Sequence, residues 1–284
     1  MTDVGSDDPA ATGSGLRLRP LGKSGLWVTE LGLGAMDTPT SPEGKRTIER
    51  ALELGVRLID TAREYSGSEQ LIGTVLRERS VPDLIISTKT FKRRSDAAQW
   101  EVYRSLEVLG VERIGLYQLH DVSTWEAWKE VTAPGGALDG LREARELGLI
   151  QAIGASIHDL DVAREAILSG AFDALMLEYS AFYPRSADLI ELARERGVGV
   201  LVMRPLGGSG RTSVIRQRVA AGLAGPLTPA NLLRYVLSHP GVSAAVPGAR
   251  YPERVEENVA VARAWEPMSE EERRELERAA AELY

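Results

Sequence analysis

The sequence predicts an α/β protein built as a (β/α)8 barrel, the TIM-barrel architecture. Eight short apolar runs alternate with segments of helical periodicity, the runs are mostly continuous rather than alternating, and the chain has 284 residues. Continuous apolar runs are typical of parallel strands buried on both faces. Eight such strands, each followed by a helix, fit a barrel of about 250 residues.

The strands are expected where short runs rich in Val, Ile and Leu occur. These runs cover residues 27–36, 56–62, 84–90, 114–121, 150–157, 174–180, 198–205 and 243–248. A doubly wound open sheet is the alternative, but it usually carries a G-x-G-x-x-G fingerprint after its first strand. The residues after "LGLG" lack that fingerprint, and "GKS" at 22–24 lacks the upstream glycine of a phosphate-binding loop, since Arg17 stands there. The barrel is therefore preferred.

Helices are expected in the segments between the strands. Segment 41–55 begins with Ser41 at a capping position and Pro42 in its first turn, and it closes on Gly55. Segments 138–148, 186–197 and 228–241 repeat this layout, the last with Thr228 as its cap. The charged segment 271–284 predicts a closing C-terminal helix.

The composition is that of a globular chain that needs no disulfides. Hydrophobic residues make up 43% and charged residues 26%, and the absence of cysteine excludes thiol catalysis and cysteine-ligated metals. A net charge of −7 argues against a nucleic-acid surface. No apolar stretch approaches the roughly 20 residues of a membrane helix, and the first residues lack the features of a signal peptide. We expect a cytoplasmic protein with a disordered tail over 1–15 and a single barrel domain over 16–284; the oligomeric state stays open.

Four reactive side chains are expected at neighbouring strand ends. Asp60 ends the second strand, Tyr65 lies in its loop, Lys89 ends the third strand and His120 ends the fourth. Residues at these ends face the active site of such barrels. Taken singly, most have an ordinary explanation: Asp60 as a loop cap, Tyr65 as a loop aromatic, His120 as a structural residue. Lys89 is harder to dismiss, because lysine is rarely placed in an apolar strand unless it is paired.

The chemistry of this set is coherent. A phenol holds a proton at neutral pH, and a neighbouring lysine cation lowers its pKa, which eases proton transfer. Asp60 would keep Lys89 charged and in place, and His120 would hydrogen-bond a substrate oxygen. The set lacks both a nucleophile with an adjacent base and a cluster of metal ligands. It therefore favours protonation of an oxygen on which negative charge develops, as in carbonyl reduction.

Ordered motifs along most of the chain resemble those of the aldo-keto reductase family. They are "LGKSGLWVTELGLGAM", "IDTAREYSGSEQLIG", "STK", "YQLHD", "IGAS" at 153–156, "RPLGG" at 204–208 and "VPGARYPERVEEN" at 246–258. The resemblance implies an opening β-hairpin, a (β/α)8 barrel, a nicotinamide cofactor and direct hydride transfer to an aldehyde or ketone. It makes Tyr65 the general acid, tuned by Lys89 and Asp60, with His120 orienting the carbonyl.

The resemblance also assigns the adenosine end of the cofactor. It places Arg254 against the 2′-phosphate or the adenine, and Glu257 and Asn258 on the adenine. An arginine suits a phosphate through its two-pronged fork. Gly248 and the residue after it stand where many family members have Lys-Ser, although Arg250 follows closely. NADP(H) is the predicted cofactor, and the pattern also permits NAD(H).

The nicotinamide end departs from the family pattern. Ser156 matches the serine that bonds the carboxamide, but Ile157 follows it in place of asparagine, and Met176 replaces the usual glutamine. Met203 and Arg204 stand where an aromatic residue commonly stacks on the ring. The glycine-rich stretch 205–211 is expected to wrap the pyrophosphate with backbone N–H groups, and from it we take Pro205, Leu206 and Gly208 as contacts.

Two further points concern substrate and alternatives. Trp125 and Trp128 either wall the substrate pocket or cover the barrel rim, and the sequence favours neither. The main hypothesis is an NADPH-dependent reductase of aldehydes, ketones or sugar-type carbonyls, working in either direction. A non-catalytic nicotinamide-binding barrel that acts as a redox sensor or regulatory subunit is the alternative. A metal-dependent barrel enzyme is disfavoured, because none of the three histidines forms an H-x-H arrangement and we expect no metal site.

Overall fold

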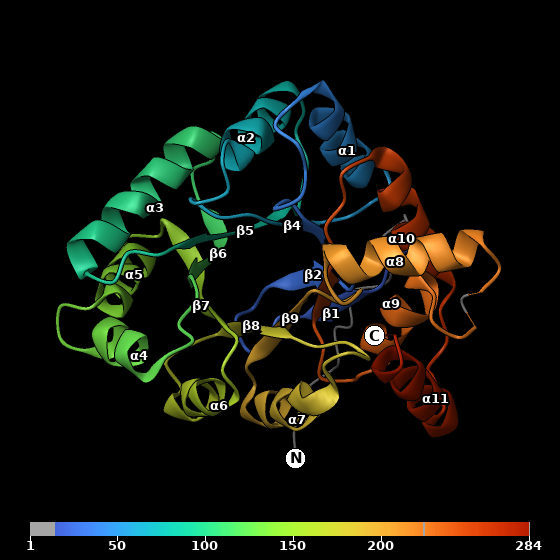
Figure 1. Cartoon of the computed structure of the whole chain (residues 1–284). Coiled ribbons are helices and arrows are strands. Elements are labelled where there is room, and N and C mark those ends of the chain that lie inside the picture. Colours follow the sequence, from blue (N-terminus) through green and yellow to red (C-terminus); the bar gives the residue numbers. More distant parts are fainter. Residues whose placement is uncertain (1–14, 224, 284) are drawn as a thin grey trace, which may run out of the picture.

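Parallel strands arranged in the order of the sequence form the barrel (Figure 1). The computed structural model describes residues 15–223 and 225–283. Within these residues the barrel has eight strands: β3 (Leu33–Gly34), β4 (Leu58–Asp60), β5 (Ile85–Thr90), β6 (Ile114–Leu119), β7 (Ile150–Ile157), β8 (Ala174–Glu178), β9 (Gly199–Met203) and β10 (Ala244–Val246). The Gly32 N–H donates to Ala245 O at 2.8 Å and the Gly34 N–H to Pro247 O at 3.0 Å, which closes the first strand onto the last. The predicted (β/α)8 barrel is confirmed. The predicted tail falls, apart from Gly15, outside the described residues.

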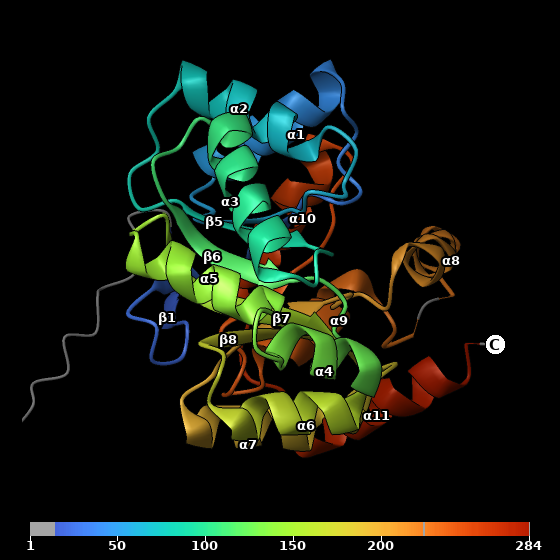
Figure 2. The ribbon, with the colours of Figure 1, turned by 90° about the vertical axis from the view of Figure 1, so that its left-hand side faces the viewer.

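A β-hairpin precedes the barrel and plugs its amino-terminal end. It pairs β1 (Leu18–Pro20) with β2 (Trp27–Thr29), and Figure 2 shows it at the end of the barrel opposite α8 (Ser209–Ala220). Leu21, Leu26 and Val28 pack with apolar side chains that point into the barrel, such as Leu58 and Leu201. The hairpin thus supplies the floor of the barrel interior, because apolar side chains there are removed from water.

The predicted first strand, residues 27–36, is two separate strands in the structure. The chain breaks after Thr29, whose hydroxyl donates to Leu31 O at 2.8 Å. The buried Glu30 carboxylate then accepts from Arg19 at 2.8 Å and from Trp265 Nε1 at 2.9 Å. These side-chain partners take the place of a continuous ladder, so the range predicted for this strand is wrong in extent.

Helices surround the barrel on its outer face (Figures 1 and 2). Those that follow the strands are α1 (Pro42–Glu53), α2 (Ser68–Glu78), α3 (Ser95–Leu109), α5 (Ala137–Glu146), α6 (Leu160–Ser169), α7 (Ala187–Arg196, after the 3₁₀ turn Pro184–Ser186), α9 (Pro229–Leu237) and α10 (Pro252–Ala264). Their apolar faces pack on the strands, and α1 buries Ile48, Ala51 and Leu52 in this way. The predicted caps are confirmed: Ser41 accepts from the Gly44 N–H at 3.4 Å and Thr228 from the Asn231 N–H at 3.1 Å.

Two insertions and a closing helix complete the fold. Helix α4 (Trp125–Thr132) follows β6, and α8 follows β9, so both stand at the carboxyl ends of strands. Helix α11 (Glu270–Ala281) ends the described chain and matches the predicted C-terminal helix. No helix of the described residues has the length and apolar character needed to cross a bilayer.

Candidate active site

A buried ion pair joins the ends of β4 and β5. Lys89 Nζ lies 2.6 Å from Asp60 Oδ2 and donates to Thr61 O at 2.7 Å, and Lys89 is 1% exposed. Register explains the meeting: Asp60 pairs with Ser87 across the two parallel strands, so Lys89 extends one pleat beyond it on the same face. The carboxylate offsets the cost of burying the ammonium group.

Two polar residues that the sequence did not reveal hold the other Asp60 oxygen. Ser87 Oγ donates to Asp60 Oδ1 at 2.8 Å, and Gln118 Nε2 donates to Ser87 Oγ at 2.8 Å and reaches Asp60 Oδ1 at 3.4 Å. Ser87 lies two positions before Lys89, and Gln118 two positions before His120. Residues two positions apart on a strand point to the same face, and this spacing was the signal that Ser87 and Gln118 face the site.

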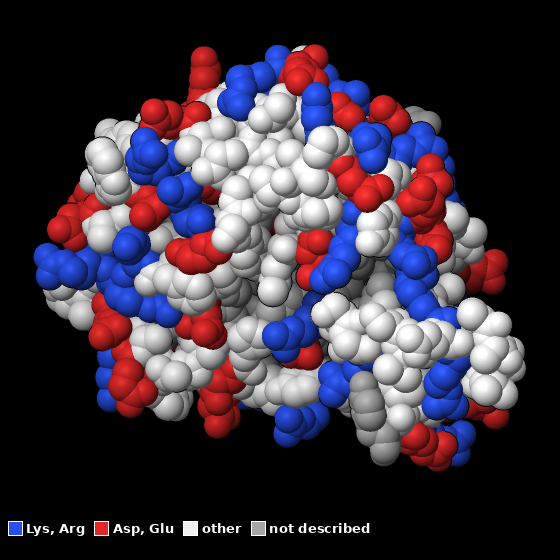
Figure 3. Space-filling model, turned by 45° about the horizontal axis from the view of Figure 1, so that its top comes forward, with Lys and Arg blue, Asp and Glu red and all other residues white. Residues whose placement is uncertain are grey.

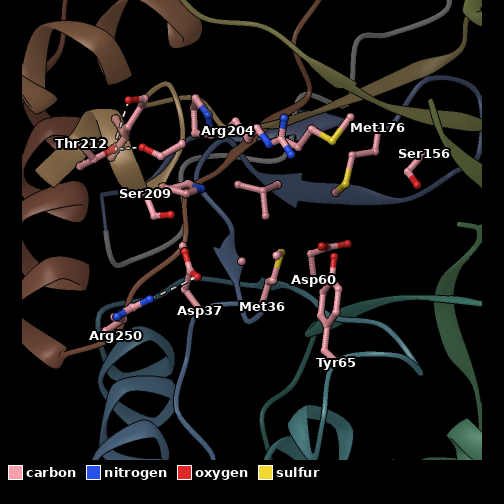
Figure 4. A pocket seen from close by; sticks show the side chains of 18 of the residues that line it. Met36, Asp37, Asp60, Tyr65, Ser156, Met176, Arg204, Ser209, Thr212 and Arg250 are labelled. Atoms are coloured by element: carbon pink, nitrogen blue, oxygen red, sulfur yellow. Dashed lines mark hydrogen bonds and ion pairs between the residues drawn. The ribbon is translucent and has the colours of Figure 1, made fainter. Parts of the chain in front are cut away.

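Tyr65 stands over this pair in the loop between β4 and α2. Its ring centroid lies 5.1 Å from Lys89 Nζ, and Figure 4 shows Tyr65 and Asp60 side by side at one end of the cavity. Burial raises the pKa of the Tyr65 phenol above its usual value, and the carboxylates of Asp60, Glu64 and Asp37 raise it further. Burial and the nearby carboxylates are the causes of this rise, and the lowering of the pKa expected from Lys89 stays a prediction. The phenol is protonated at neutral pH.

His120 completes the group at the end of β6. Its ring meets the Tyr65 ring edge-on at 5.6 Å between centroids and stacks on Phe91 at 4.1 Å. His120 Nδ1 lies 3.1 Å from Glu64 Oε2, and Glu64 Oε1 accepts from the Phe91 N–H at 2.8 Å. Sequence reasoning found His120 but neither Glu64 nor Phe91. The signal for Glu64 was its place directly before Tyr65 in the same loop.

A cavity of about 970 Å³ opens above these four residues at the carboxyl end of the barrel. Figure 3 looks toward this hollow and shows basic side chains along its edge. Of the residues predicted to bind cofactor, the cavity is lined by Ser156, Met176, Met203, Arg204, Pro205, Leu206, Gly208, Gly248, Arg250, Arg254 and Asn258. Met36, Asp37 and Tyr251 also line it, although no pattern in the sequence singles them out.

Near Tyr65 the cavity wall is made by strand ends β7 to β9. Ser156 Oγ accepts from the Asp121 N–H at 2.8 Å, which leaves its own hydroxyl proton for another acceptor. Met176 and Met203 present thioethers in place of an amide and an aromatic ring (Figure 4 shows Met176 opposite Tyr65). Flexible methionines can pack on a flat ring.

Arg204 begins the loop after β9 in a strained conformation. Its φ of 51° lies in the left-handed region, and its carbonyl accepts from the Gly207 N–H at 2.8 Å to form a turn. Arg204 Nη1 lies 3.1 Å from Glu178 Oε2, which anchors the guanidinium at the rim. Strain of this kind clusters at functional sites.

The far end of the cavity is rich in donors and positive charge. Helix α8 begins there after Gly208, and Ser209, Gly210, Thr212 and Ser213 of its first turns line the cavity, so the N–H groups of the helix start lie at its wall. Arg216, Arg250 and Arg254 line the same end. The stretch 205–211, expected to wrap the pyrophosphate, runs into the first turn of α8. Amide donors and arginines suit a pyrophosphate and a ribose phosphate, so a nicotinamide dinucleotide fits this cavity.

Glu257 takes a different place from the other predicted cofactor residues. Its carboxylate lies 2.7 Å from both Arg216 Nη1 and Arg254 Nη1, and it is not among the residues that line the cavity. Burial tends to raise the Glu257 pKa, but hydrogen bonds from Arg216 and Arg254 lower it below its usual value. In this structure Glu257 links α8 to α10.

The two tryptophans also lie outside the cavity lining. Trp125 is half exposed as the first residue of α4, and Trp128 packs against Phe172, with ring centroids 6.2 Å apart. Which of the two roles left open by the sequence they have stays a prediction. Among the described residues no cluster of three or more His, Cys, Asp or Glu side chains is placed to hold a metal ion.

Comparison with known proteins places this site in a family. Residues 30–222 match the model of the "Aldo/keto reductase family". The chain is 26% identical to an uncharacterized oxidoreductase of Bacillus subtilis (92% of this chain, 96% of the relative) and 26% identical to the NADH-specific methylglyoxal reductase of Escherichia coli (66% of each). It superposes on the holo form of an aldo-keto reductase from Bacillus halodurans with a TM-score of 0.79 at 26% identity, over 93% of this chain and 96% of the other. The chain belongs to the aldo/keto reductase family of oxidoreductases, which act on carbonyl and alcohol groups.

Proposed function

We propose that the protein is an NADP(H)-dependent reductase that interconverts an aldehyde, ketone or sugar-type carbonyl and the alcohol, with Tyr65 as general acid. One observation carries the proposal: the Asp60–Lys89 pair, Tyr65 and His120 meet at one end of a cavity whose other end is lined by arginines. A bound nicotinamide would supply or accept the hydride. The cytoplasmic location of the protein stays a prediction from the sequence.

The residues divide the work by position. Ser156, Met176 and Met203 would hold the nicotinamide against the reacting carbon, while Arg250, Arg254 and the start of α8 would bind the phosphates. Tyr65 gives a proton to the substrate oxygen, and Lys89, held by Asp60, stabilises the negative charge that forms there. His120 hydrogen-bonds the same oxygen and fixes the carbonyl in a reactive orientation.

The arginines support NADP(H) over NAD(H). A 2′-phosphate adds negative charge at the end of the cavity where Arg216, Arg250 and Arg254 lie. Glu257 already binds two of these arginines, so NAD(H), which lacks that phosphate, remains the second cofactor of the proposal. A relative in the family is named for its NADH specificity.

Fluorescence titration with NADPH and NADH tests the cofactor assignment. We expect tighter binding of NADPH by the wild type and a loss of that preference in Arg254→Ala and Arg250→Ala. Arg218→Ala is the matched control, because Arg218 lies on α8 but is exposed and outside the cavity lining. If neither nucleotide binds at micromolar concentration, the reductase proposal fails.

A carbonyl panel then tests the reaction. It should include small 2-oxoaldehydes, because one relative is named for methylglyoxal reduction, together with simple ketones and aldoses. Nucleotide binding without turnover on any of them would favour the non-catalytic alternative.

A further inference from the structure

We propose that Glu64 holds His120 as the Nδ1–H tautomer, so that Nε2 donates to a substrate oxygen only when the ring is protonated. His120 is then an acid–base group beside Tyr65 rather than a neutral orienting group, and Glu64 is its positioning residue. The inference rests on the proposed function for its second step, the movement of the proton.

Three segments fix the His120 ring. Glu64 comes from the loop after β4, Phe91 follows β5 and His120 follows β6. The Phe91 ring stacks on the imidazole with an interplanar angle of 11°, which sets the ring plane, and Glu64 Oε2 at 3.1 Å from Nδ1 sets its rotation. His120 lines the cavity, so Nε2 is the ring nitrogen left for a ligand.

The state of Glu64 decides the tautomer. Burial tends to raise the pKa of its carboxyl, but hydrogen bonds from His120 and the Phe91 N–H outweigh burial and lower the pKa below its usual value. Glu64 is therefore ionised at neutral pH and can only accept hydrogen bonds. Nδ1 must carry the proton, as in other sites where a carboxylate fixes an imidazole.

Other charged and titratable groups surround the dyad. Lys89 and Asp60, from β5 and β4, form a neutral pair beneath the Tyr65 phenol. Asp121 follows His120, and Arg93, from the loop after β5, donates to Asp121 O at 2.8 Å. On the β9 side Arg204 is paired with Glu178, which also faces His158. Glu64 is the carboxylate in hydrogen-bond contact with the His120 ring.

The proton then follows a defined route in reduction. As the carbonyl carbon gains a hydride and the C=O π bond breaks, the oxygen takes the Tyr65 phenol proton. The imidazolium of His120 passes its Nε2 proton through the new hydroxyl to the phenolate and ends as the neutral ring. A proton taken up from the solvent restores the imidazolium before the next cycle, and alcohol oxidation runs through the same steps in reverse and releases that proton. The raised pKa of Tyr65 supports this route, because it makes a lasting phenolate unfavourable.

Long-range ¹H–¹⁵N NMR of the histidine-labelled protein tests the tautomer without cofactor or turnover. We expect His120 in the Nδ1–H form in the wild type, and in the Nε2–H form in Glu64→Val, which has no acceptor. Glu64→Gln keeps an acceptor but loses the charge, so it should keep the Nδ1–H tautomer. His120→Asn assigns the signals among the three histidines. Glu178→Gln is the matched control: its carboxylate lies 3.8 Å from His158 Nδ1, so it should shift His158 alone.

Kinetics test the second step. In the wild type, kcat/KM for reduction should fall about tenfold per pH unit above the His120 midpoint found by NMR, and kcat/KM for oxidation should fall below it. In Glu64→Val this fall of kcat/KM for reduction above the His120 midpoint should disappear. The proposal is overturned by an Nε2–H tautomer in the wild type, or by a kcat/KM that does not change with pH at that midpoint. Failure of the proposed function shows separately, as absent nucleotide binding in a protein whose NMR still reports the Nδ1–H form.

Discussion

Lys89 Nζ and Asp60 Oδ2 lie 2.6 Å apart at the bottom of the cavity, where both side chains are almost fully buried. Neither charge can be removed alone without leaving the other unpaired in a medium of low dielectric constant. The free energy of unfolding of the barrel therefore depends on two residues of the candidate site, which the first prediction tests.

Removing either partner should destabilise the protein strongly. Asp60→Ala and Lys89→Met should each lower the free energy of unfolding by about 3–5 kcal/mol, because each leaves one buried charge without its partner. The double variant should lose much less than the sum of the two. Urea unfolding of the four proteins measures this, and strictly additive losses would show that the ion pair is not coupled.

Tyr65→Phe should abolish most turnover and spare nucleotide binding. Loss of the phenol removes a positioned proton donor, which typically contributes about 10²–10⁴-fold to rate. The ring remains to fill its place, so the Kd for NADPH and the melting temperature should change little. Steady-state kinetics beside a binding titration separate the two effects. A variant that keeps near-normal kcat would assign the proton to another group.

Gly207→Ala should disturb the loop that leads into α8 more than Gly208→Ala does. Both glycines have positive φ, 83° and 89°, so both variants strain the backbone. A Cβ on Gly207 would also meet Phe182 Cδ2 at 2.4 Å, whereas one on Gly208 meets nothing within 4 Å. We expect a lower melting temperature for Gly207→Ala, partly restored by Phe182→Ala. Equal losses in the two glycine variants would show that strain alone matters.

The attachment of α11 should weaken in acid through Glu272. Hydrogen bonds from Arg234 and from the Ser269 N–H lower the pKa of Glu272 from 4.5 to about 2. A lowered pKa in the folded state means that this stabilisation is present above pH 4.5 and is lost as the pH falls toward 2. The difference in melting temperature between the wild type and Glu272→Gln should shrink over that range. A constant difference would mean that the charge of Glu272 plays no part.

Much of the architecture could be predicted because it depends on local patterns. The apolar runs placed β4 to β10 within a few residues, and Ser41 and Thr228 marked helix starts through contacts only three residues away. The break between β2 and β3 could not be predicted in this way. It depends on Glu30 and its bond to Trp265, which lies 235 residues further along the chain.

Some residues of the candidate site could likewise be predicted from the sequence, and others could not. Asp60, Lys89 and His120 stand at or next to strand ends and Tyr65 in the loop after β4, where the order of the strands brings residues together. Glu64 looks like any loop carboxylate until the loops after β4 and β6 are placed side by side. Glu257, which lies outside the cavity lining, pairs with Arg216 of α8, a helix with no counterpart in the predicted pattern.

The hairpin β1–β2 has a consequence for how ligands reach the site. Since it closes the amino-terminal end of the barrel, every ligand of Tyr65 has to enter and leave through the carboxyl-terminal end. A dinucleotide that extends from Met176 and Met203 to the arginines, as proposed, would occupy the deeper part of that opening. A smaller carbonyl compound would then have to enter second and depart first, because both ligands of the proposed reaction would use the same opening.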